Sequence, residues 1–370
     1  MNTVAVEHQD VITEVRGQVG CITLNRPKAL NALNLGMVRT LTAILLQWQA
    51  DPGVTAVAIR GSNKVGPFGA FCAGGDIRFF HHAALAGNPE LEDFFTEEYA
   101  LNHLIHQYPK PYIAFMDGIV MGGGMGISQG ASHRVVTAHT KMAMPETGIG
   151  LFPDVGGGYF LGRCPGHTGE WLALTGEIIS GEDAIHLGLA DYWMDTSVLG
   201  DAWAALEQLD ATPAALGAWI AMFSGAAPVI PMRARGQIDT YFGLSSVLDI
   251  VRALEASADE WAPQTAAALR KRSPLMLHVT LEQVRRARGM TLAADLRMER
   301  DLVRHCFATQ HLERSGPSSE TVEGIRALAV DKDHAPQWNP ARLEDVTPEM
   351  VAPFFDSPWP AASHPLAALT

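Results

Sequence analysis

Two spacings of hydrophobic positions alternate along the first half of the chain. Short β-rich runs predict strands, whereas other segments repeat their apolar residues at the spacing of one helix face. The runs that predict strands are residues 11–15, 20–24, 54–60, 112–116 and 135–137. The helical patterns include residues 37–49, 92–106, 181–187, 274–288 and 292–306. The order of these elements indicates an α/β protein.

The repeated order of strand, strand and helix, with short connections, predicts a stacked spiral rather than an open doubly wound sheet. From about residue 202 the pattern becomes mostly helical, and the stretch 224–236, rich in Gly, Ala and Pro, is typical of a connection between helices. We therefore expect a spiral core at residues 10–205 and a mainly helical region at 206–350. The tail at 351–370 is expected to be poorly ordered because it is rich in Pro and Ala.

Composition narrows the class of protein. The chain has 370 residues, 47% of them hydrophobic, and a formal net charge of −13. This hydrophobic fraction is ample for a packed core. No apolar run is long enough to span a bilayer and residues 1–10 show no export or import signal, so we expect a cytoplasmic protein without a membrane partner. The acidic balance argues against nucleic acid as a partner, because neutralising phosphates requires clustered Lys and Arg.

The most informative segment chemically is MPETGIGLFPDVGGG, at residues 144–158. It places Glu146 and Asp154 eight positions apart in an apolar, glycine-rich run, and neither acid has an adjacent Lys or Arg. Burial raises the pKa of a carboxyl group toward the range useful for acid, base or nucleophilic work. A turn in which the acids only cap backbone amides is the alternative. Two such acids beside further glycine-rich runs favour an active site.

Two glycine-rich runs, AGGD at 73–76 and MGGGMG at 121–126, each lead into a predicted helix. Glycine lets a ligand approach the backbone closely, and the start of a helix offers unpaired N–H donors. One donor from each run could bind a carbonyl oxygen as it becomes an anion. Tight packing of a helix against a sheet would also account for such glycines, so both interpretations stay open at this point.

Four ordered motifs resemble the crotonase, or enoyl-CoA hydratase/isomerase, superfamily. They are LNRPKALNAL at 24–33, AFCAGGDI at 70–77, GIVMGGGMGIS at 118–128 and PETGIGLFPDVGG at 145–157. The similarity covers about residues 11–192, and the segment 323–340 resembles a longer form of the superfamily's closing segment. The resemblance implies a crotonase-type spiral of ββα units with an extended helical C-terminal region. It also implies acyl-CoA substrates, in which CoA is part of the substrate, so that neither a separate cofactor nor a metal is expected.

In that superfamily two backbone amides form an oxyanion hole, and by the match of motifs they belong here to Gly75 and Gly123. The resemblance further implies that CoA lies along the first two motifs. Arg26, Lys28 and Lys332 are candidate phosphate partners, although all three would equally suit a solvated surface. The CoA-binding residues implied in this way are Arg26, Lys28, Ala29, Ala73, Gly74 and Asp76.

Departures from the hydratase pattern indicate a particular branch. Related hydratases carry a catalytic glutamate directly after the GGG-x unit, where this chain has Gly126, whereas their second glutamate corresponds to Glu146. The chain also has Asp154 where hydratases usually have a small residue. Together with VTLEQ at 279–283 and the long helical C-terminal part, these features most resemble the branch that hydrolyses 3-hydroxyisobutyryl-CoA in valine degradation.

That branch implies that Glu98, Gly123, Glu146 and Asp154 surround the substrate, with Glu146 and Asp154 as the catalytic residues. Independently, Glu98 falls on the apolar face of its predicted helix, where an unpaired acid is unusual, although solvation at the helix surface is an alternative. The expected reaction is hydrolysis of a short-chain 3-hydroxyacyl-CoA thioester. A nucleophilic and a general-base role of Glu146 both stay open.

Other interpretations compete with this one. Residues 126–130 match G-x-S-x-G, the nucleophile elbow of α/β-hydrolases, but the preceding MGGGM is a poor strand former and that motif needs a strand. The histidines at 81, 82, 103 and 106 lack companions at metal-ligand spacing, and the four scattered cysteines are expected to be core thiols. A hydratase or isomerase that uses Glu146 or Asp154 alone, and a silent acyl-CoA-binding protein, are the competing functions. A homo-oligomer also fits, because superfamily members are often trimeric.

Overall fold

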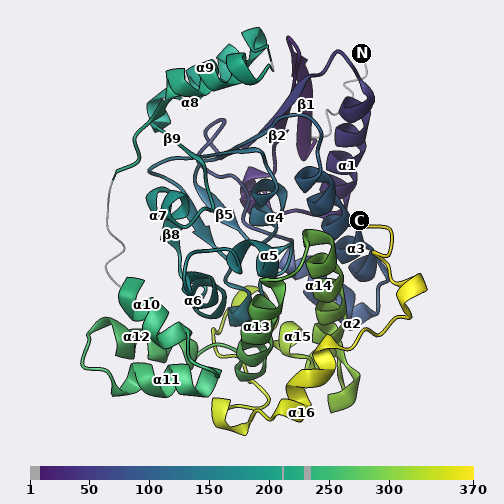
Figure 1. Ribbon diagram of the computed structural model, residues 1–370. Helices are drawn as coiled ribbons and strands as arrows, with labels where there is room; N and C mark the ends of the chain where they lie inside the picture. Colours follow the sequence, from purple (N-terminus) through teal and green to yellow (C-terminus); the bar gives the residue numbers. More distant parts are fainter. Residues whose placement is uncertain (1–8, 211, 229–234) are drawn as a thin grey trace.

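The computed structural model describes residues 9–210, 212–228 and 235–370. Residues 1–8, on which the expectation about targeting signals rests, and residues 229–234 of the expected connection lie outside this description. Figure 1 shows the strands in the upper half of the molecule and most helices of the second half of the chain below them.

The larger sheet has seven strands. They are β1 (Val11–Arg16), β2 (Val19–Leu24), β3 (Ala56–Gly61), β4 (Tyr112–Met116), β6 (His133–Val136), β9 (Tyr192–Met194) and β10 (Ser224–Gly225). Their order in the sheet is β1-β2-β3-β4-β6-β9-β10. The first two strands form an antiparallel hairpin, the strands from β2 to β9 are parallel, and β10 runs antiparallel to β9.

A second, three-stranded sheet is made of β5 (Ile119–Met121), β7 (Lys141–Ala143) and β8 (Ile179–Ser180), in that order. The chain passes from β4 to β5 and from β6 to β7, and thus alternates between the two sheets as it advances. This alternation is the stacked spiral that the sequence predicts, so the predicted fold class is confirmed.

Helices occupy the predicted positions within a few residues. Those of the first part are α1 (Leu35–Ala50), α2 (Ile77–Ala86), α3 (Glu90–His106), α4 (Gly123–Gln129), α5 (Gly157–Leu161), α6 (Thr168–Thr175), α7 (Gly181–His186), α8 (Leu199–Ala205) and α9 (Pro213–Phe223). Those of the second part are α10 (Arg235–Phe242), α11 (Val247–Ala256), α12 (Trp261–Leu269), α13 (Pro274–Ala287), α14 (Leu292–Phe307), α15 (Glu320–Ile325) and α16 (Pro348–Val351). Across the described ranges, none of the helices has the length and apolar character needed to cross a membrane.

The larger sheet is buried on both faces because side chains alternate along each strand. In β4, Ala114 and Met116 join the main hydrophobic core, whereas Ile113 and Phe115 point to the opposite face. There α8 and α9 cover the sheet with Trp203 and other apolar side chains, as the upper left of Figure 1 shows. The main core is continuous from the first strand to the C-terminal helices. The predicted division at residues 205 and 206 stays a prediction.

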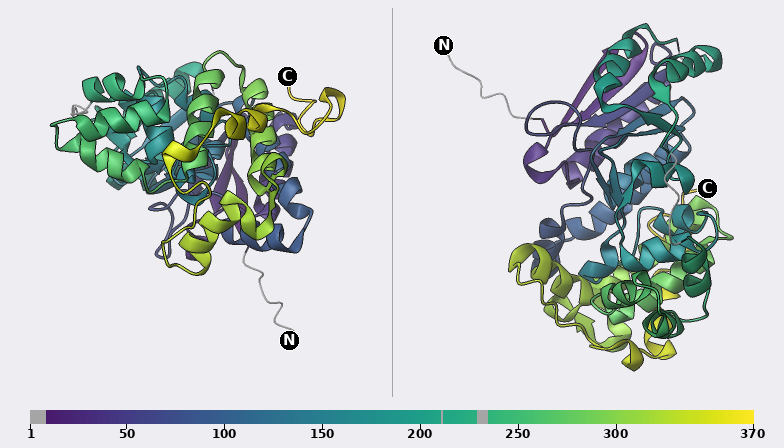
Figure 2. Two further views of the ribbon diagram at one scale, coloured as in Figure 1. Left: turned by 90° about the horizontal axis from the view of Figure 1, so that it is seen from below. Right: turned by 90° about the vertical axis from the view of Figure 1, so that its left-hand side faces the viewer.

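The C-terminal helices pack directly on the spiral. α13 contacts α5 and α6, α14 contacts α3, and α15 contacts the segment after β7. The two further views in Figure 2 show these helices gathered at the end of the molecule opposite the hairpin of β1 and β2. The C-terminal helices therefore form part of the wall of the space between α3, α5 and the second sheet.

The prediction of a poorly ordered tail is wrong. Phe354 is 1% exposed and Leu366 is 2% exposed, and both belong to the main core. His364 and Ser357 both contact Asp301 of α14, at 3.2 Å and 2.8 Å. The Pro and Ala content misled the prediction because a few well-placed apolar and polar anchors are enough to fix a tail that lacks regular structure.

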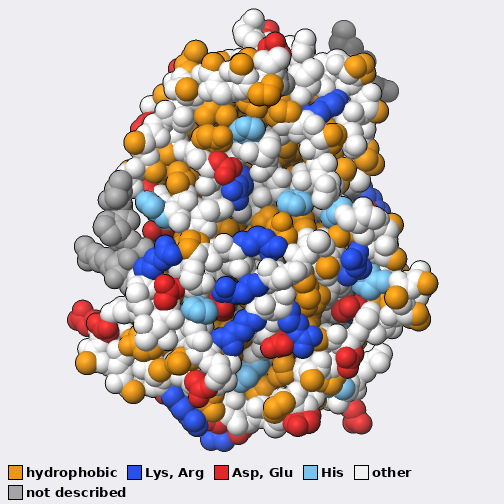
Figure 3. All heavy atoms as spheres, viewed as in Figure 1, with side chains coloured by type: hydrophobic (Ala, Val, Ile, Leu, Met, Phe, Trp, Pro, Cys, Tyr) orange, Lys and Arg blue, Asp and Glu red, His pale blue; other side chains and the backbone are white. Residues whose placement is uncertain are grey.

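Basic side chains gather in the middle of one face, over α5 and α13, despite the acidic net charge (Figure 3). The arginines of this region use internal acceptors. Arg285 donates to the carbonyl of Ser245 at 2.7 Å, Arg286 to Glu282 at 2.7 Å, and Arg288 to Glu170 at 2.7 Å. Arg285 and Arg288 therefore join the end of α13 to neighbouring segments, whereas the pair of Arg286 lies within α13.

Replacing Phe354 with alanine tests the anchoring of the tail. Loss of a buried phenylalanine costs about 3–5 kcal/mol, so Phe354→Ala should lower the free energy of unfolding by that amount in urea titrations. Met222→Ala is the control, because Met222 is 73% exposed and the change should cost less than about 0.5 kcal/mol. Equal effects of the two substitutions would contradict the packed tail.

Candidate active site

A cavity of about 360 Å³ lies between the two glycine-rich runs, α3 and the segment after β7. It brings together the five residues that the sequence predicts for catalysis, the oxyanion hole and substrate binding. Its lining includes Ala73, Gly74, Gly75, Phe80, Phe95, Glu98, Gly122, Gly123, Glu146, Ile149, Leu151, Asp154, Val155, Arg272 and Leu328.

The two glycine-rich runs are in close backbone contact. A Cβ on Gly124 would lie 2.3 Å from the carbonyl oxygen of Cys72, so no larger residue fits there. Gly74 and Gly122 have φ angles of +107° and +47°, which favour glycine. Within the described residues, the N–H groups of Gly75 and Gly123 donate to no internal acceptor. Both interpretations of these glycines therefore apply: the two backbones pack tightly, and among the described residues their N–H groups are free to donate.

Glu98 projects from α3 toward the second glycine-rich run. Its side chain is 2% exposed, and its Oε1 atom has no hydrogen-bond partner among the described residues. A Cβ on Gly123 would lie 2.5 Å from this Oε1 atom, so the carboxyl group touches the glycine backbone. Burial, with Asp154 and Glu146 as further causes, raises the pKa of Glu98 well above its usual value. Solvation at the helix surface, the alternative for Glu98, is excluded.

Glu146 opens a short 3-10 segment, η2 (Glu146–Ile149), directly after Pro145. It is 6% exposed, and its Oε2 atom lacks a partner in the part of the chain that is described. Its Oε1 atom lies 2.7 Å from the position that a Cβ on Gly122 would take. Burial raises the pKa of Glu146 well above its usual value, and the charge of Asp154 is the second cause of this rise.

Asp154 approaches the same cavity from the turn before α5 and is 5% exposed. Tyr99, the neighbour of Glu98 on α3, donates its hydroxyl to Asp154 Oδ2 at 2.8 Å. Burial raises the pKa of Asp154 to about 6, and the bond from Tyr99 opposes that rise. Of the three acids, Asp154 therefore has the hydrogen bond that most favours its ionised form.

Among the described residues, Arg272 is the one cation in the cavity lining, and no local pattern in the sequence points to it because it lies far along the chain. One end of its guanidinium group donates to the carbonyl of Thr175, whereas its Nε atom has no partner among the described residues. Its charge lowers the pKa of Glu146, against the larger effect of burial. Tyr99 was also missed as a functional residue, although it stands beside Glu98 in the sequence.

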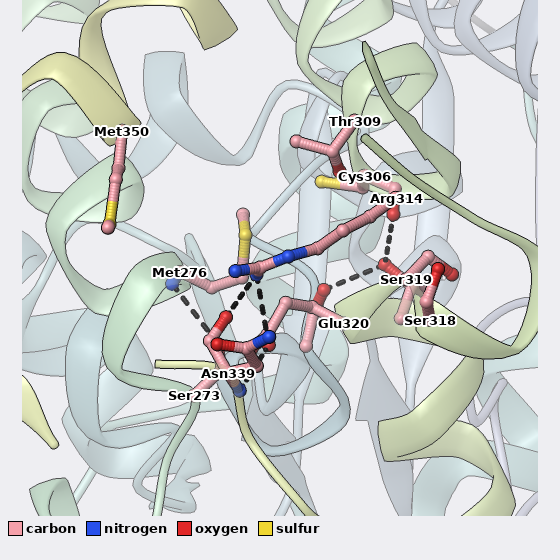
Figure 4. A network of polar contacts seen from close by, with 12 residues as sticks. Ser273, Met276, Cys306, Thr309, Arg314, Ser318, Ser319, Glu320, Asn339 and Met350 are labelled. Carbon is pink, nitrogen blue, oxygen red and sulfur yellow. Dashed lines mark hydrogen bonds and ion pairs between the residues drawn. The ribbon is translucent and has the colours of Figure 1, made fainter. Parts of the chain in front are cut away.

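The segment that carries Glu146 is held by the C-terminal region. Figure 4 shows part of that region, the polar network around Ser273, Glu320 and Asn339. The Ser273 N–H donates to the carbonyl of Thr147 at 3.1 Å, and the Ser273 hydroxyl donates to Glu320. Glu320 also accepts from the Asn339 N–H at 2.9 Å. Thr321 donates its hydroxyl to the carbonyl of Gly150 at 2.7 Å. Residues distant in sequence thus fix the backbone within the short η2 segment and directly after it.

The residues implied for CoA are less uniform. Ala73 and Gly74 line the cavity, whereas Arg26 forms an ion pair with Asp76 at 2.8 Å and also donates to the carbonyl of Ala32 at 3.0 Å. This internal pairing makes Arg26 and Asp76 part of the local structure. Lys28 and Lys332 are exposed, and Ala29 is half-buried beside Lys28 in the 3-10 segment Pro27–Ala29. Their roles in CoA binding stay predictions.

The nucleophile elbow is not formed. Ser128 lies inside α4, is fully buried, and donates its hydroxyl to the carbonyl of Gly124 at 2.7 Å. The strand before this helix ends at Met121, five positions before Gly126, so the strand and serine geometry of an elbow is absent from this described segment. All four cysteines are buried and free, as expected.

Comparisons with known proteins assign the class. The model of the enoyl-CoA hydratase/isomerase family matches residues 19–355, which is most of the chain. The chain belongs to this family, and its crotonase-type fold is confirmed.

Its relatives carry more specific names. The rat 3-hydroxyisobutyryl-CoA hydrolase, mitochondrial, is 39% identical over 358 residues, which cover 95% of this chain and 90% of the relative. The human protein of the same name is 36% identical over 356 residues, covering 94% and 89%. Among solved structures, a carnitinyl-CoA dehydratase from Mycobacterium thermoresistibile is 42% identical with a TM-score of 0.85, and an enoyl-CoA hydratase from Rhodobacter sphaeroides is 36% identical with a TM-score of 0.84. Both alignments cover 95% of this chain and 98% of the other.

Replacing Glu98 with glutamine tests the burial of the acid cluster. Because the pKa of Glu98 is raised in the folded state, the unfolded chain releases this proton at lower pH, and stability is lost as pH rises from about 4.5 toward the folded pKa. Glutamine avoids this loss. We expect Glu98→Gln to be more stable than the wild type at pH 8, by more than about 1 kcal/mol, and the difference to shrink at pH 5.

Thermal unfolding at both pH values measures the effect. Glu97→Gln is the matched control, because Glu97 is the adjacent acid but faces Arg39 at 2.7 Å on the surface. If both variants changed alike with pH, the burial of Glu98 would be contradicted.

Proposed function

We propose that this protein hydrolyses the thioester of a short-chain 3-hydroxyacyl-CoA, and 3-hydroxyisobutyryl-CoA most readily, to give CoA and the free 3-hydroxy acid. The observation that carries the proposal is the placement of three buried carboxyl groups opposite two unpaired backbone N–H groups in one cavity. The names of the rat and human relatives support the same substrate.

In the proposed reaction the thioester oxygen lies between the N–H groups of Gly75 and Gly123. Both donors are fixed by the close contact of their backbones, so they need no rearrangement when negative charge develops on this oxygen. The surrounding wall is largely apolar, with Phe80, Phe95 and Leu151, and keeps the local dielectric low. These conditions stabilise a tetrahedral intermediate.

Glu146 is proposed to start the reaction in one of two ways. As a nucleophile, its carboxylate attacks the carbonyl carbon, the C–S bond breaks, CoA leaves as the thiol after gaining a proton, and water then hydrolyses the acyl-enzyme anhydride. As a general base, it takes a proton from a water molecule whose oxygen attacks the same carbon, and the C–S bond then breaks as Glu146 returns this proton to the CoA sulfur. Asp154 holds the 3-hydroxyl group and shares protons with Glu146.

The groups around the cavity favour different protonation states for the three acids. Arg272 favours the ionised form of Glu146, and the bond from Tyr99 favours the ionised form of Asp154. Glu98 has neither a nearby cation nor a hydrogen bond that favours its ionised form, and the charges of Asp154 and Glu146 both oppose its ionisation. Glu98 is therefore the acid that stays protonated. A protonated Glu98 can donate a hydrogen bond to the substrate beside Gly123.

A second candidate function is hydration of an enoyl-CoA, as the names of the two similar proteins of known structure suggest. In related hydratases the additional glutamate would stand at Gly126. A Cβ on Gly126 would lie 2.7 Å from Val155 and 2.9 Å from Asn102, so this position leaves no room for a glutamate. Because water addition benefits from two groups that act on one water, we favour hydrolysis. The cavity of about 360 Å³ is at the small end for ligand sites and suits a short acyl group.

Several finer statements stay predictions within this proposal. They are a role in valine degradation, a cytoplasmic location, a homo-oligomeric state and a reaction that uses no cofactor beyond the CoA of the substrate. The rat and human relatives are named as mitochondrial proteins.

Replacing Glu146 with glutamine tests the proposed role, because it removes the charge with little change in shape. We expect kcat for CoA release from 3-hydroxyisobutyryl-CoA to fall about 10²- to 10⁴-fold, measured with a thiol reagent. Glu97→Gln is the control and should keep full activity, since Glu97 lies on the surface outside the cavity. A Glu146→Gln enzyme as fast as the wild type would refute the role. Loss of the enoyl absorbance of crotonyl-CoA without thiol release would favour the hydratase.

The pH dependence of kcat/KM should show an acidic limb near pH 6 or above, rather than near 4, because burial raises the pKa of Asp154 to about 6 and that of Glu146 well above its usual value. Activity falls below this limb as the carboxylates take up protons. Tyr99→Phe removes the bond that favours ionised Asp154 and should move the limb to higher pH. A limb that stays in place in Tyr99→Phe would contradict the coupling.

A further inference from the structure

The turn that carries Asp154 rests on a pair of acids that lie outside the substrate cavity. We propose that Glu299 of α14, with Asp295 one helical turn before it, is a positioning residue that fixes Asp154 for catalysis by holding the amide groups of this turn. The inference rests on the proposed thioester hydrolysis. α14 and α5, which meet in the middle of Figure 1, belong to segments far apart in the sequence.

The turn after Asp154 has an unfavourable backbone conformation. Val155 has a φ of +56° and Gly156 a φ of +86°, both in the left-handed region. For a β-branched residue such as Val155 this region is strained, and it persists only where the surroundings hold it. Val155 also lines the cavity, so the turn presents both its side chain and that of Asp154 to the substrate.

Glu299 holds the turn by accepting hydrogen bonds from its amide groups. Its Oε2 atom accepts from the Gly156 N–H at 2.7 Å, and its Oε1 atom accepts from the Gly158 N–H at 3.0 Å. Asp295 accepts from the Tyr159 N–H at 2.8 Å through its Oδ2 atom. Three amide groups at the start of α5, those of residues 156, 158 and 159, are thus satisfied by two carboxyl groups of one helix.

Gln283 of α13 holds the other side of the turn. Its amide nitrogen donates to the carbonyl of Pro153 at 2.6 Å and to Glu299 Oε1 at 3.1 Å. The residues before and after Asp154 are therefore fixed to the same carboxyl group. The Asp154 side chain itself is free to meet Tyr99 on the cavity side, at 2.8 Å.

Burying two carboxyl groups to hold this turn costs free energy of folding. Glu299 and Asp295 are both fully buried, neither forms an ion pair within the described residues, and Oδ1 of Asp295 has no hydrogen-bond partner there. The charge of Asp295 further disfavours ionisation of Glu299. Burial accordingly raises the pKa of Asp295 to about 6 and that of Glu299 well above its usual value. Such groups are retained where they serve a site more often than where they serve stability.

Glu299→Gln tests the proposal. The amide keeps the shape but replaces one acceptor by a donor, which then faces a turn N–H group. We expect kcat on 3-hydroxyisobutyryl-CoA to fall about 10- to 100-fold, because misplacing a catalytic group by about 1 Å has effects of this size, while KM changes less than about threefold. The acidic limb of the pH profile should also move to higher pH, since a relaxed turn weakens the bond from Tyr99 that favours ionised Asp154.

Glu170→Gln is the matched control. Glu170 is 1% exposed and binds Arg288 at 2.7 Å, outside the cavity lining, so its loss should lower the melting temperature but leave kcat and the pH profile unchanged. Gln283→Leu provides a second variant if Glu299→Gln does not fold. It loosens the other side of the turn and should reproduce the fall in kcat and the shift of the limb.

The outcomes separate the two proposals. A wild-type enzyme that releases no CoA from 3-hydroxyacyl thioesters would refute the proposed function. An active wild type, with Glu299→Gln or Gln283→Leu that lose stability like Glu170→Gln but keep kcat and the pH profile, would overturn the positioning role alone. A fall in kcat with a displaced limb, absent from Glu170→Gln, supports it.

Discussion

The close contact between two glycine-rich backbone segments is the constraint on which the site depends. Gly124 packs against the carbonyl of Cys72 so tightly that a single methyl group would not fit. This contact sets the separation of the N–H groups of Gly75 and Gly123 and leaves both without an internal acceptor in the described structure. Because the donors are fixed before any ligand arrives, the acids that face them decide which chemistry the cavity performs.

Those acids are placed by elements from the whole chain, and their burial is what makes them reactive. Glu98 comes from α3, Glu146 from the segment after β7, and Asp154 from the turn before α5. Isolated buried carboxyl groups destabilise a fold at neutral pH, so the rest of the structure must offset them. The continuous core that joins the spiral to the C-terminal helices offsets this cost.

The C-terminal region therefore does more than cover the spiral. Ser273 and Glu320 brace the segment of Glu146, Arg272 contributes the cation of the cavity, and Glu299 holds the turn of Asp154. Helices outside the spiral thus fix the positions of acids that the spiral itself carries.

The sequence by itself determined the local elements and the chemical groups. The alternation of apolar residues fixed the strands and helices, the glycine runs indicated the donors, and Glu98, Glu146 and Asp154 could be selected because apolar surroundings are visible in a linear pattern. Only the tertiary structure decided the roles of Arg272, Tyr99 and the acids of α14, as well as the anchoring of the tail. These depend on contacts between residues tens to hundreds of positions apart, such as 143 between Gly156 and Glu299, and no local spacing encodes such a contact.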